Sequence, residues 1–207
     1  HNRCRRQRQM CIRDRTQNHV YSDEMEHDAC GVGLVASTEG KKSRMVVDYG
    51  IEALKAVWHR GAVDADGKTG DGAGIHLEIP KDFFIEKIQV TGHDYDNSEI
   101  CVGMIFLPRN DYSSQESSKT IVESELTKSN FSIYGWRQVP VNPKVLGEKA
   151  FQTMPEIIQV LFKSNDVNLL DKDLERKIYE TRKKIESQAD NLSLNNFYVC
   201  SMSSKSI

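Results

Sequence analysis

The sequence lacks any hydrophobic run long enough to cross a membrane. A transmembrane helix needs about 20 consecutive, mostly apolar residues, and no such stretch occurs among the 207 residues. The basic amino-terminal stretch is not followed by an apolar segment, so a secretory signal peptide is not expected either. We therefore expect neither membrane association nor secretion.

The sequence also has few cysteines and a small net charge. The five cysteines are an odd, scattered set without a Cys-x-x-Cys pair: Cys4, Cys11, Cys30, Cys101 and Cys200. This argues against a disulfide scaffold and against a structural zinc site. The formal net charge of -2 gives no reason to expect nucleic acid or a membrane surface as a partner. The hydrophobic fraction of 38% is ordinary for a globular domain with a core.

The chain divides into three parts. Residues 1–15 are rich in arginine and are predicted to be a disordered, non-native extension. Residues 16–29 are polar and acidic and are predicted to be a leader or propeptide. Residues 30–207 carry the expected folded domain. The chain begins with His and stops within a strand-like segment, so both ends are expected to be cut.

Hydrophobic periodicity predicts a mixture of strands and helices. Spacings of three and four predict helices over residues 47–58, 81–88, 112–129 and 174–188. Apolar runs and alternation predict strands over residues 30–36, 75–79, 99–107, 131–139, 157–162 and 197–202. Gly61 is expected to end the first helix, and Glu180 to pair with Lys184 on the last. Because strands and helices do not alternate strictly, the order favours an α+β fold over a Rossmann-like sheet.

Cys30 opens the first expected strand, between the small residues Ala29 and Gly31. A lone cysteine there is usually a small buried hydrophobe, and that alternative stays open. If the chain is cleaved after Ala29, the new α-amine lies beside its own thiol. Such an amine has a pKa of about 7.7–8.0, so much of it is neutral and can take the thiol proton. The thiolate would then attack a carboxamide carbon and expel ammonia.

The loop over residues 63–74 is rich in glycine and aspartate. It fails as an EF-hand because Lys68 stands at the fifth position and Ile75 where a bidentate glutamate is required. It fails as a phosphate loop because the earlier glycine would fall at Ala62 and a strand follows. Its glycine spacing also fails the dinucleotide fingerprint. The simplest prediction is a tight loop whose glycines allow positive φ angles.

Several motifs together resemble the class II glutamine amidotransferases, and specifically their glutamate synthase branch. The matching segments are Cys30-Gly-Val-Gly-Leu-Val-Ala36, His59-Arg60-Gly61-Ala62, Asp64-Ala-Asp66-Gly-Lys-Thr-Gly70-Asp71-Gly72-Ala-Gly74-Ile75, Phe106-Leu-Pro108, Gly135-Trp-Arg-Gln-Val-Pro140, Val145-Leu-Gly147 and Phe197-Tyr-Val-Cys-Ser201. The resemblance implies an N-terminal nucleophile hydrolase fold, a four-layer αββα sandwich that is incomplete at the carboxyl end. Residues 30–207 would be the first part of the glutaminase domain.

The resemblance also implies roles for particular residues. Cys30 is implied as the nucleophile. Arg60 is implied to lie beside it and help hold it, although an arginine at a helix end is otherwise a surface residue stabilised by the helix dipole. His59 is given a structural role, and Gly31, Gly61 and Asp71 are expected to support the site. The family's Asn-Gly and Arg-Phe-Ser-Thr motifs do not occur, so the oxyanion and substrate-binding groups are expected beyond residue 207.

The same resemblance implies partners and cofactors. L-glutamine would be the substrate, and its ammonia would serve glutamate formation from 2-oxoglutarate in the remaining synthase domains of the same chain. No metal or cofactor is expected in this segment, whereas FMN and an iron–sulfur cluster are implied for the full-length enzyme. The compartment would be cytoplasmic, or a plastid in a photosynthetic eukaryote.

Two alternatives remain open. One is another class II amidotransferase such as an asparagine synthetase, against which the loop ending at Gly74 argues. The other is a non-catalytic module with the same fold. An uncleaved segment that lacks the oxyanion groups is itself expected to be inactive.

Overall fold

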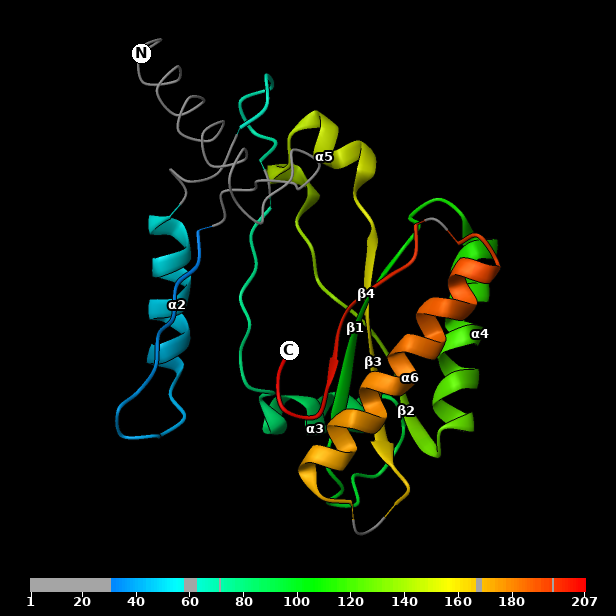
Figure 1. The fold of residues 1–207 in the computed structure, drawn as a ribbon. Coiled ribbons are helices and arrows are strands. Elements are labelled where there is room, and N and C mark those ends of the chain that lie inside the picture. Colours follow the sequence, from blue (N-terminus) through cyan, green and yellow to red (C-terminus); the bar gives the residue numbers. More distant parts are fainter. Residues whose placement is uncertain (1–30, 58–62, 71, 167–168, 195) are drawn as a thin grey trace, which may run out of the picture.

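The computed structural model describes residues 31–57, 63–70, 72–166, 169–194 and 196–207 (Figure 1). Its elements are α2 (Arg44–Ala56), α3 (Lys81–Val90), β1 (Cys101–Leu107), α4 (Tyr112–Lys128), β2 (Phe131–Gln138), η2 (Pro143–Val145), α5 (Glu148–Thr153), β3 (Glu156–Ser164), α6 (Asp171–Asn191) and β4 (Tyr198–Ser203). The strands form an antiparallel sheet of order β2-β3-β1-β4. The α+β prediction is confirmed.

Strand β1 lies inside the sheet, paired with β3 on one side and β4 on the other. Val102 faces Leu161 in the β3 register, and Gly103 faces Met202 in the β4 register. Five of its seven residues are buried, because both faces of the strand are covered. This explains why its sequence is a continuous apolar run instead of an alternating one.

The two faces of the sheet carry different cores. Helices α4 and α6 cover one face (Figure 1), where Ile105, Phe162 and Ile178 belong to one cluster of buried side chains. Helix α3 and the segment 75–80 cover the other face, where Phe84 and Val102 belong to a second cluster. The side chains of β1 therefore alternate between the two cores with the period of two expected for a strand.

The longer predicted helices are confirmed, with shifts of a few residues at their ends. The predictions over residues 81–88, 112–129 and 174–188 correspond to α3, α4 and α6. Helix α2 ends at Ala56, and Gly61, which was expected to stop it, lies outside the described residues. The four later strand predictions correspond to β1, β2, β3 and β4.

Two predicted strands and one predicted ion pair are wrong. Residues 31–36 form no strand with any described segment, and Leu34 is 91% exposed. Residues 75–79 form only an isolated bridge, between Glu78 and Ser206. On α6 the predicted ion pair between Glu180 and Lys184 is not formed. The ion pairs on this helix instead join Glu186 to Arg182 and to Lys183, at 2.7 Å each. Within the described ranges, no helix is long and apolar enough to cross a bilayer.

Candidate active site

An apolar groove of about 1150 Å³ lies on the amino-terminal side of the molecule. Its walls are residues 31–35, one face of α2, and residues 74–80. Figure 1 shows α2 and the segment before it on the side of the molecule away from α4 and α6. The groove is therefore built from the part of the chain in which the sequence places the expected nucleophile and glycine-rich loop.

Small residues bring the walls of this groove together. The apolar stripe of α2 is half-buried, and Ser43 caps the helix by accepting a hydrogen bond from the amide of Met45 at 3.2 Å. A Cβ placed on Gly33 would lie 4.0 Å from the Cβ of Ala53, and one on Gly50 would lie 3.2 Å from Ile75. Gly33 therefore packs against the Ala53 side chain of α2 at an ordinary van der Waals distance.

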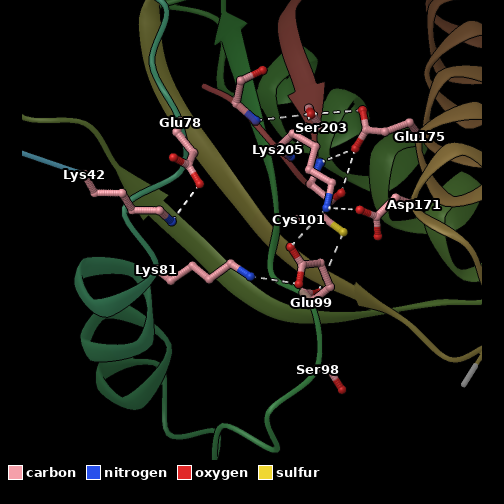
Figure 2. Close-up of polar contacts among 12 residues, drawn as sticks. Lys42, Glu78, Lys81, Ser98, Glu99, Cys101, Asp171, Glu175, Ser203 and Lys205 are labelled. Carbon is pink, nitrogen blue, oxygen red and sulfur yellow. Dashed lines mark hydrogen bonds and ion pairs between the residues drawn. The ribbon is translucent and has the colours of Figure 1, made fainter. Parts of the chain in front are cut away.

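Polar contacts hold the wall formed by residues 74–80. Lys42 pairs with Glu78 at 2.6 Å, which joins the turn before α2 to this segment (Figure 2). The amides of Leu77 and Ile207 each donate to the carbonyl of the other residue at 2.9 Å. The segment is therefore attached to α2 on one side and to the end of the described chain on the other.

A charged network stabilises residues 203–207, on which that wall rests. Lys205 pairs with Asp171 at 2.9 Å and lies 3.7 Å from Glu99, which also pairs with Lys81 at 2.9 Å (Figure 2). The hydrogen bond with Asp171 raises the pKa of Lys205 above its ordinary value. Because the lysine stays charged at neutral pH, it can hold α6 and the segment before β1 together.

The structure describes one of the six site residues expected from the sequence. Gly31 is exposed and lines the groove. The others, Cys30, His59, Arg60, Gly61 and Asp71, lie outside the described residues. Val57, the last described residue before the His59-Arg60-Gly61 motif, also lines the groove. Gly31 follows Cys30 and Val57 precedes the His59-Arg60-Gly61 motif, so the described residues nearest to both expected site segments line the same groove.

The glycine-rich loop is a tight hairpin as far as it is described. Val63 and Gly70 form a bridge, and Gly67 and Gly72 have φ angles of 68° and 89°. This confirms the prediction of a tight loop whose glycines adopt positive φ. Hydrogen bonds from the side chain and amide of Thr69 hold the pKa of Asp66 well below its ordinary value.

The two described cysteines lie away from the groove. Cys101 is fully buried in β1, and its burial raises the pKa of the thiol well above the ordinary value. Cys200 is exposed on β4. A reactive cysteine needs access and a lowered pKa, so Cys101 is unsuited to be a nucleophile. Among the described side chains no group of three His, Cys, Asp or Glu residues is placed to hold a metal ion.

Comparison with known proteins shows the family. The profile of the class-II glutamine amidotransferases matches residues 30–207, and the chain belongs to this family.

The similar proteins within it are glutamate synthases. The large chain of glutamate synthase [NADPH] from Azospirillum brasilense is 50% identical over 192 residues, which cover 93% of this chain and 13% of that protein. The ferredoxin-dependent glutamate synthase of Pyropia yezoensis is 38% identical over 191 residues, covering 89% and 12%. The chloroplastic ferredoxin-dependent enzyme of Spinacia oleracea is 37% identical over 185 residues, covering 88% and 11%. The chain thus spans only about an eighth of the length of these relatives.

Sequence reasoning missed two residues that contact the glycine-rich loop from α5. Lys149 pairs with Asp64 at 2.5 Å, and Gly147 packs directly against Asp66 and Thr69. Gly147 belongs to a motif shared with the family, but its neighbours are distant in sequence. The only sequence signal for this contact is the glycine at position 147. Its φ of -72° does not require glycine, so the reason for it is the close contact.

Proposed function

We propose that this chain is the glutamine-hydrolysing part of a glutamate synthase. The observation that carries the proposal is that the family match begins at residue 30, directly before Gly31 in the wall of the large groove. The same groove is lined by Val57, which precedes the His59-Arg60-Gly61 motif. The groove would bring L-glutamine to Cys30.

The proposed reaction starts with removal of residues 16–29 and everything before them. The freed α-amine of Cys30 takes the proton of its own thiol, and the thiolate attacks the carboxamide carbon of glutamine. The tetrahedral intermediate collapses to a thioester as the nitrogen leaves, protonated, as ammonia. Water then hydrolyses the thioester to glutamate and regenerates the thiol.

The remaining roles follow the family resemblance. Arg60 would hold the nucleophile, while His59, Gly61 and Asp71 would support the site together with Gly31. Two oxyanion donors are needed, each contributing about 3–4 kcal/mol to the transition state. These donors and the groups that bind the substrate would come from residues after 207.

We also propose the four-layer αββα sandwich for the complete domain. Its support is the order of layers in the described part of the chain. Helices α4 and α6 cover one face of the sheet, and Ile79 packs on the other face beside Leu161. Residues 31–35 and α2 share a groove with residues 74–80.

For the whole protein, the relatives suggest a synthase that makes glutamate from glutamine-derived ammonia and 2-oxoglutarate. FMN and an iron–sulfur cluster, which the resemblance to glutamate synthases implies for the full-length enzyme, would lie in other domains of the same chain. The compartment would be cytoplasmic, or a plastid as in the relatives named chloroplastic.

The test uses the native protein that carries this chain. We expect Cys30→Ala to lower glutamine hydrolysis by at least about 1000-fold, because the covalent route is lost. Cys200→Ala, on exposed β4 and outside the groove, is the matched control and should retain the wild-type rate. Mass spectrometry should find Cys30 at the mature amino terminus. Normal hydrolysis by Cys30→Ala, or with residue 29 still attached, would refute the proposal.

A further inference from the structure

The carboxylate of Asp66 organises the glycine-rich loop from within. One of its oxygens, Oδ1, accepts hydrogen bonds from the amides of Lys68 at 2.9 Å and Thr69 at 2.7 Å. The other, Oδ2, accepts the hydroxyl of Thr69 at 2.5 Å. The amide of Glu148, at the start of α5, also helps to lower the pKa of this carboxylate. A residue inside the loop therefore interacts with a distant part of the chain.

Gly147 is the place where the loop and α5 touch. The residue is buried, and a Cβ added to it would lie 2.7 Å from the amide nitrogen of Thr69 and closer still to Asp66 Oδ2 and Thr69 Oγ1. Its φ of -72° is one that any residue adopts, so the backbone conformation does not require glycine. The requirement is steric: the position admits no side chain while the loop is seated.

A second contact joins the same two elements. Lys149 in α5 pairs with Asp64 at the beginning of the loop, at 2.5 Å, and this bond lowers the pKa of Asp64. The lysine side chain is 69% exposed, and an exposed ion pair alone stabilises little. The ion pair between Lys149 and Asp64 instead orients the loop, because it fixes a second point of the loop relative to α5.

Helix α5 is itself attached to the main sheet. It lies in the connection between β2 and β3, which pair along most of their length. Phe151 in α5 also lies under the guanidinium of Arg109, which follows β1, with 5.0 Å between the guanidinium carbon and the ring centroid. A loop that is seated on α5 is therefore linked to the sheet through the connection between β2 and β3 and through Arg109.

We propose that Gly147 and Asp66 form a docking contact that positions the glycine-rich loop for glutamine hydrolysis, with Lys149 and Thr69 as supporting positioning residues. This inference rests on the proposed function. In the sequence, the docked hairpin is flanked by the His59-Arg60-Gly61 motif on one side and by Gly74 on the other, and Gly74 lines the groove. If the hairpin moves off α5, the residues on either side of it lose their place relative to the nucleophile. A misplacement of about 1 Å at a reacting centre can cost about 100-fold in rate.

The first test measures docking directly, by hydrogen–deuterium exchange in the native protein. We expect Gly147→Ala and Thr69→Val to raise amide exchange over residues 63–70 by about tenfold, with the exchange of β1 and β3 unchanged. Thr69→Ser, which keeps the hydroxyl that donates to Asp66, should restore the wild-type pattern. An unchanged exchange pattern in Gly147→Ala would overturn the docking contact.

The second test measures glutamine hydrolysis by the same variants. We expect kcat to fall about tenfold or more in Gly147→Ala and Thr69→Val, with KM changed by less than about threefold, because the substrate-binding groups lie elsewhere. The matched control is Lys144→Met: Lys144 is exposed in η2 and has no ion pair within the described residues. Increased exchange with a wild-type kcat would overturn the positioning role. If the unmodified protein hydrolyses no glutamine, the proposed function fails, while the exchange experiment still decides whether the loop docks.

Discussion

Glu175 of α6 accepts two hydrogen bonds from Ser204, one from its amide and one from its hydroxyl, each 2.7 Å long. The hydroxyl of Ser203 donates a third to the other oxygen at 3.0 Å (Figure 2). Ser204 is only 1% exposed and directly precedes the residues that pair with Leu77 and Ile79. One carboxylate on a helix thus fixes where the chain leaves β4.

Removing this carboxylate should destabilise the fold. We expect Glu175→Ala to lower the free energy of unfolding by about 2 kcal/mol, because the buried amide and hydroxyl of Ser204 lose a charged acceptor. Urea unfolding of the native protein, followed by tryptophan fluorescence, measures the effect. Glu180→Ala, at an exposed position on the same helix, should change stability by less than about 0.5 kcal/mol. Equal losses in the two variants would contradict the prediction.

Gly103 in β1 has no room for a side chain. A Cβ there would lie 2.7 Å from Val160 Cγ1 and 3.1 Å from Met202 Cε. We expect Gly103→Ala to cost about 1–3 kcal/mol through overpacking.

The double variant tests the cause of that loss. Val160→Ala removes the methyl group in the way, so Gly103→Ala combined with Val160→Ala should be less destabilised than the sum of the two single changes. Denaturant unfolding of all four proteins gives the coupling. Additive losses would show that crowding by Val160 is not the cause.

Asp96 makes the free energy of unfolding depend on pH in the acidic range. An ion pair with Lys163 holds the pKa of Asp96 well below its ordinary value of 3.8, and the hydroxyl of Tyr134 donates to it at 2.9 Å. A lowered folded pKa contributes stability above the unfolded value, and that stability is lost as the pH falls toward the folded pKa. Asp96→Asn should therefore lose less stability than the parent between about pH 6 and pH 3.

The tyrosine gives a second measure of the same contact. Tyr134→Phe removes one hydrogen bond in a residue that is 4% exposed, and should cost about 1 kcal/mol at neutral pH. Because the ion pair between Asp96 and Lys163, the largest cause of the lowered pKa, remains, this variant should keep most of the acid dependence of the parent. Urea midpoints across the pH series check both expectations, and a parallel loss of acid dependence in Tyr134→Phe would contradict the assignment.

The described cysteines should differ sharply in reactivity. Only the thiolate is alkylated, and burial both blocks access to Cys101 and raises the pKa of its thiol. Exposed Cys200 should react with iodoacetamide in the folded protein, while Cys101 should react only after unfolding. Peptide mass spectrometry at several pH values measures both sites. Labelling of Cys101 at the rate of Cys200 would show that β1 is more open than described.

The sequence predicts best the elements whose hydrophobic periodicity does not depend on which other segment they pack against. Helix α6 is recognisable because Leu174, Ile178 and Ile185 recur on one buried face. Residues 31–36 have the apolar composition of a strand, but a strand also needs a neighbour, and the described part of the chain supplies none. Composition predicts the tendency of a segment, whereas pairing depends on the rest of the fold.

The site shows the same division. The tight turn at Gly67 follows from local residue types and spacing, and it is confirmed. The role of Cys30 is implied by the family motif and stays a prediction. The contact of Asp66 with Gly147 joins parts of the chain that no local pattern relates. Helix α5 escaped prediction because six residues carry too little periodicity. Long-range packing had to be seen in three dimensions.

The pairing of Leu77 with Ile207 also constrains how the protein is made. A ribosome adds about 5–20 residues each second, so the first of these residues emerges on the order of ten seconds before the second. During that interval the strip around Leu77 lacks the backbone partners that Lys205 and Ile207 later supply, and the apolar side chains beside it are open to other nascent chains. Slower translation should lengthen this vulnerable period and increase the demand for chaperones at this stage of synthesis.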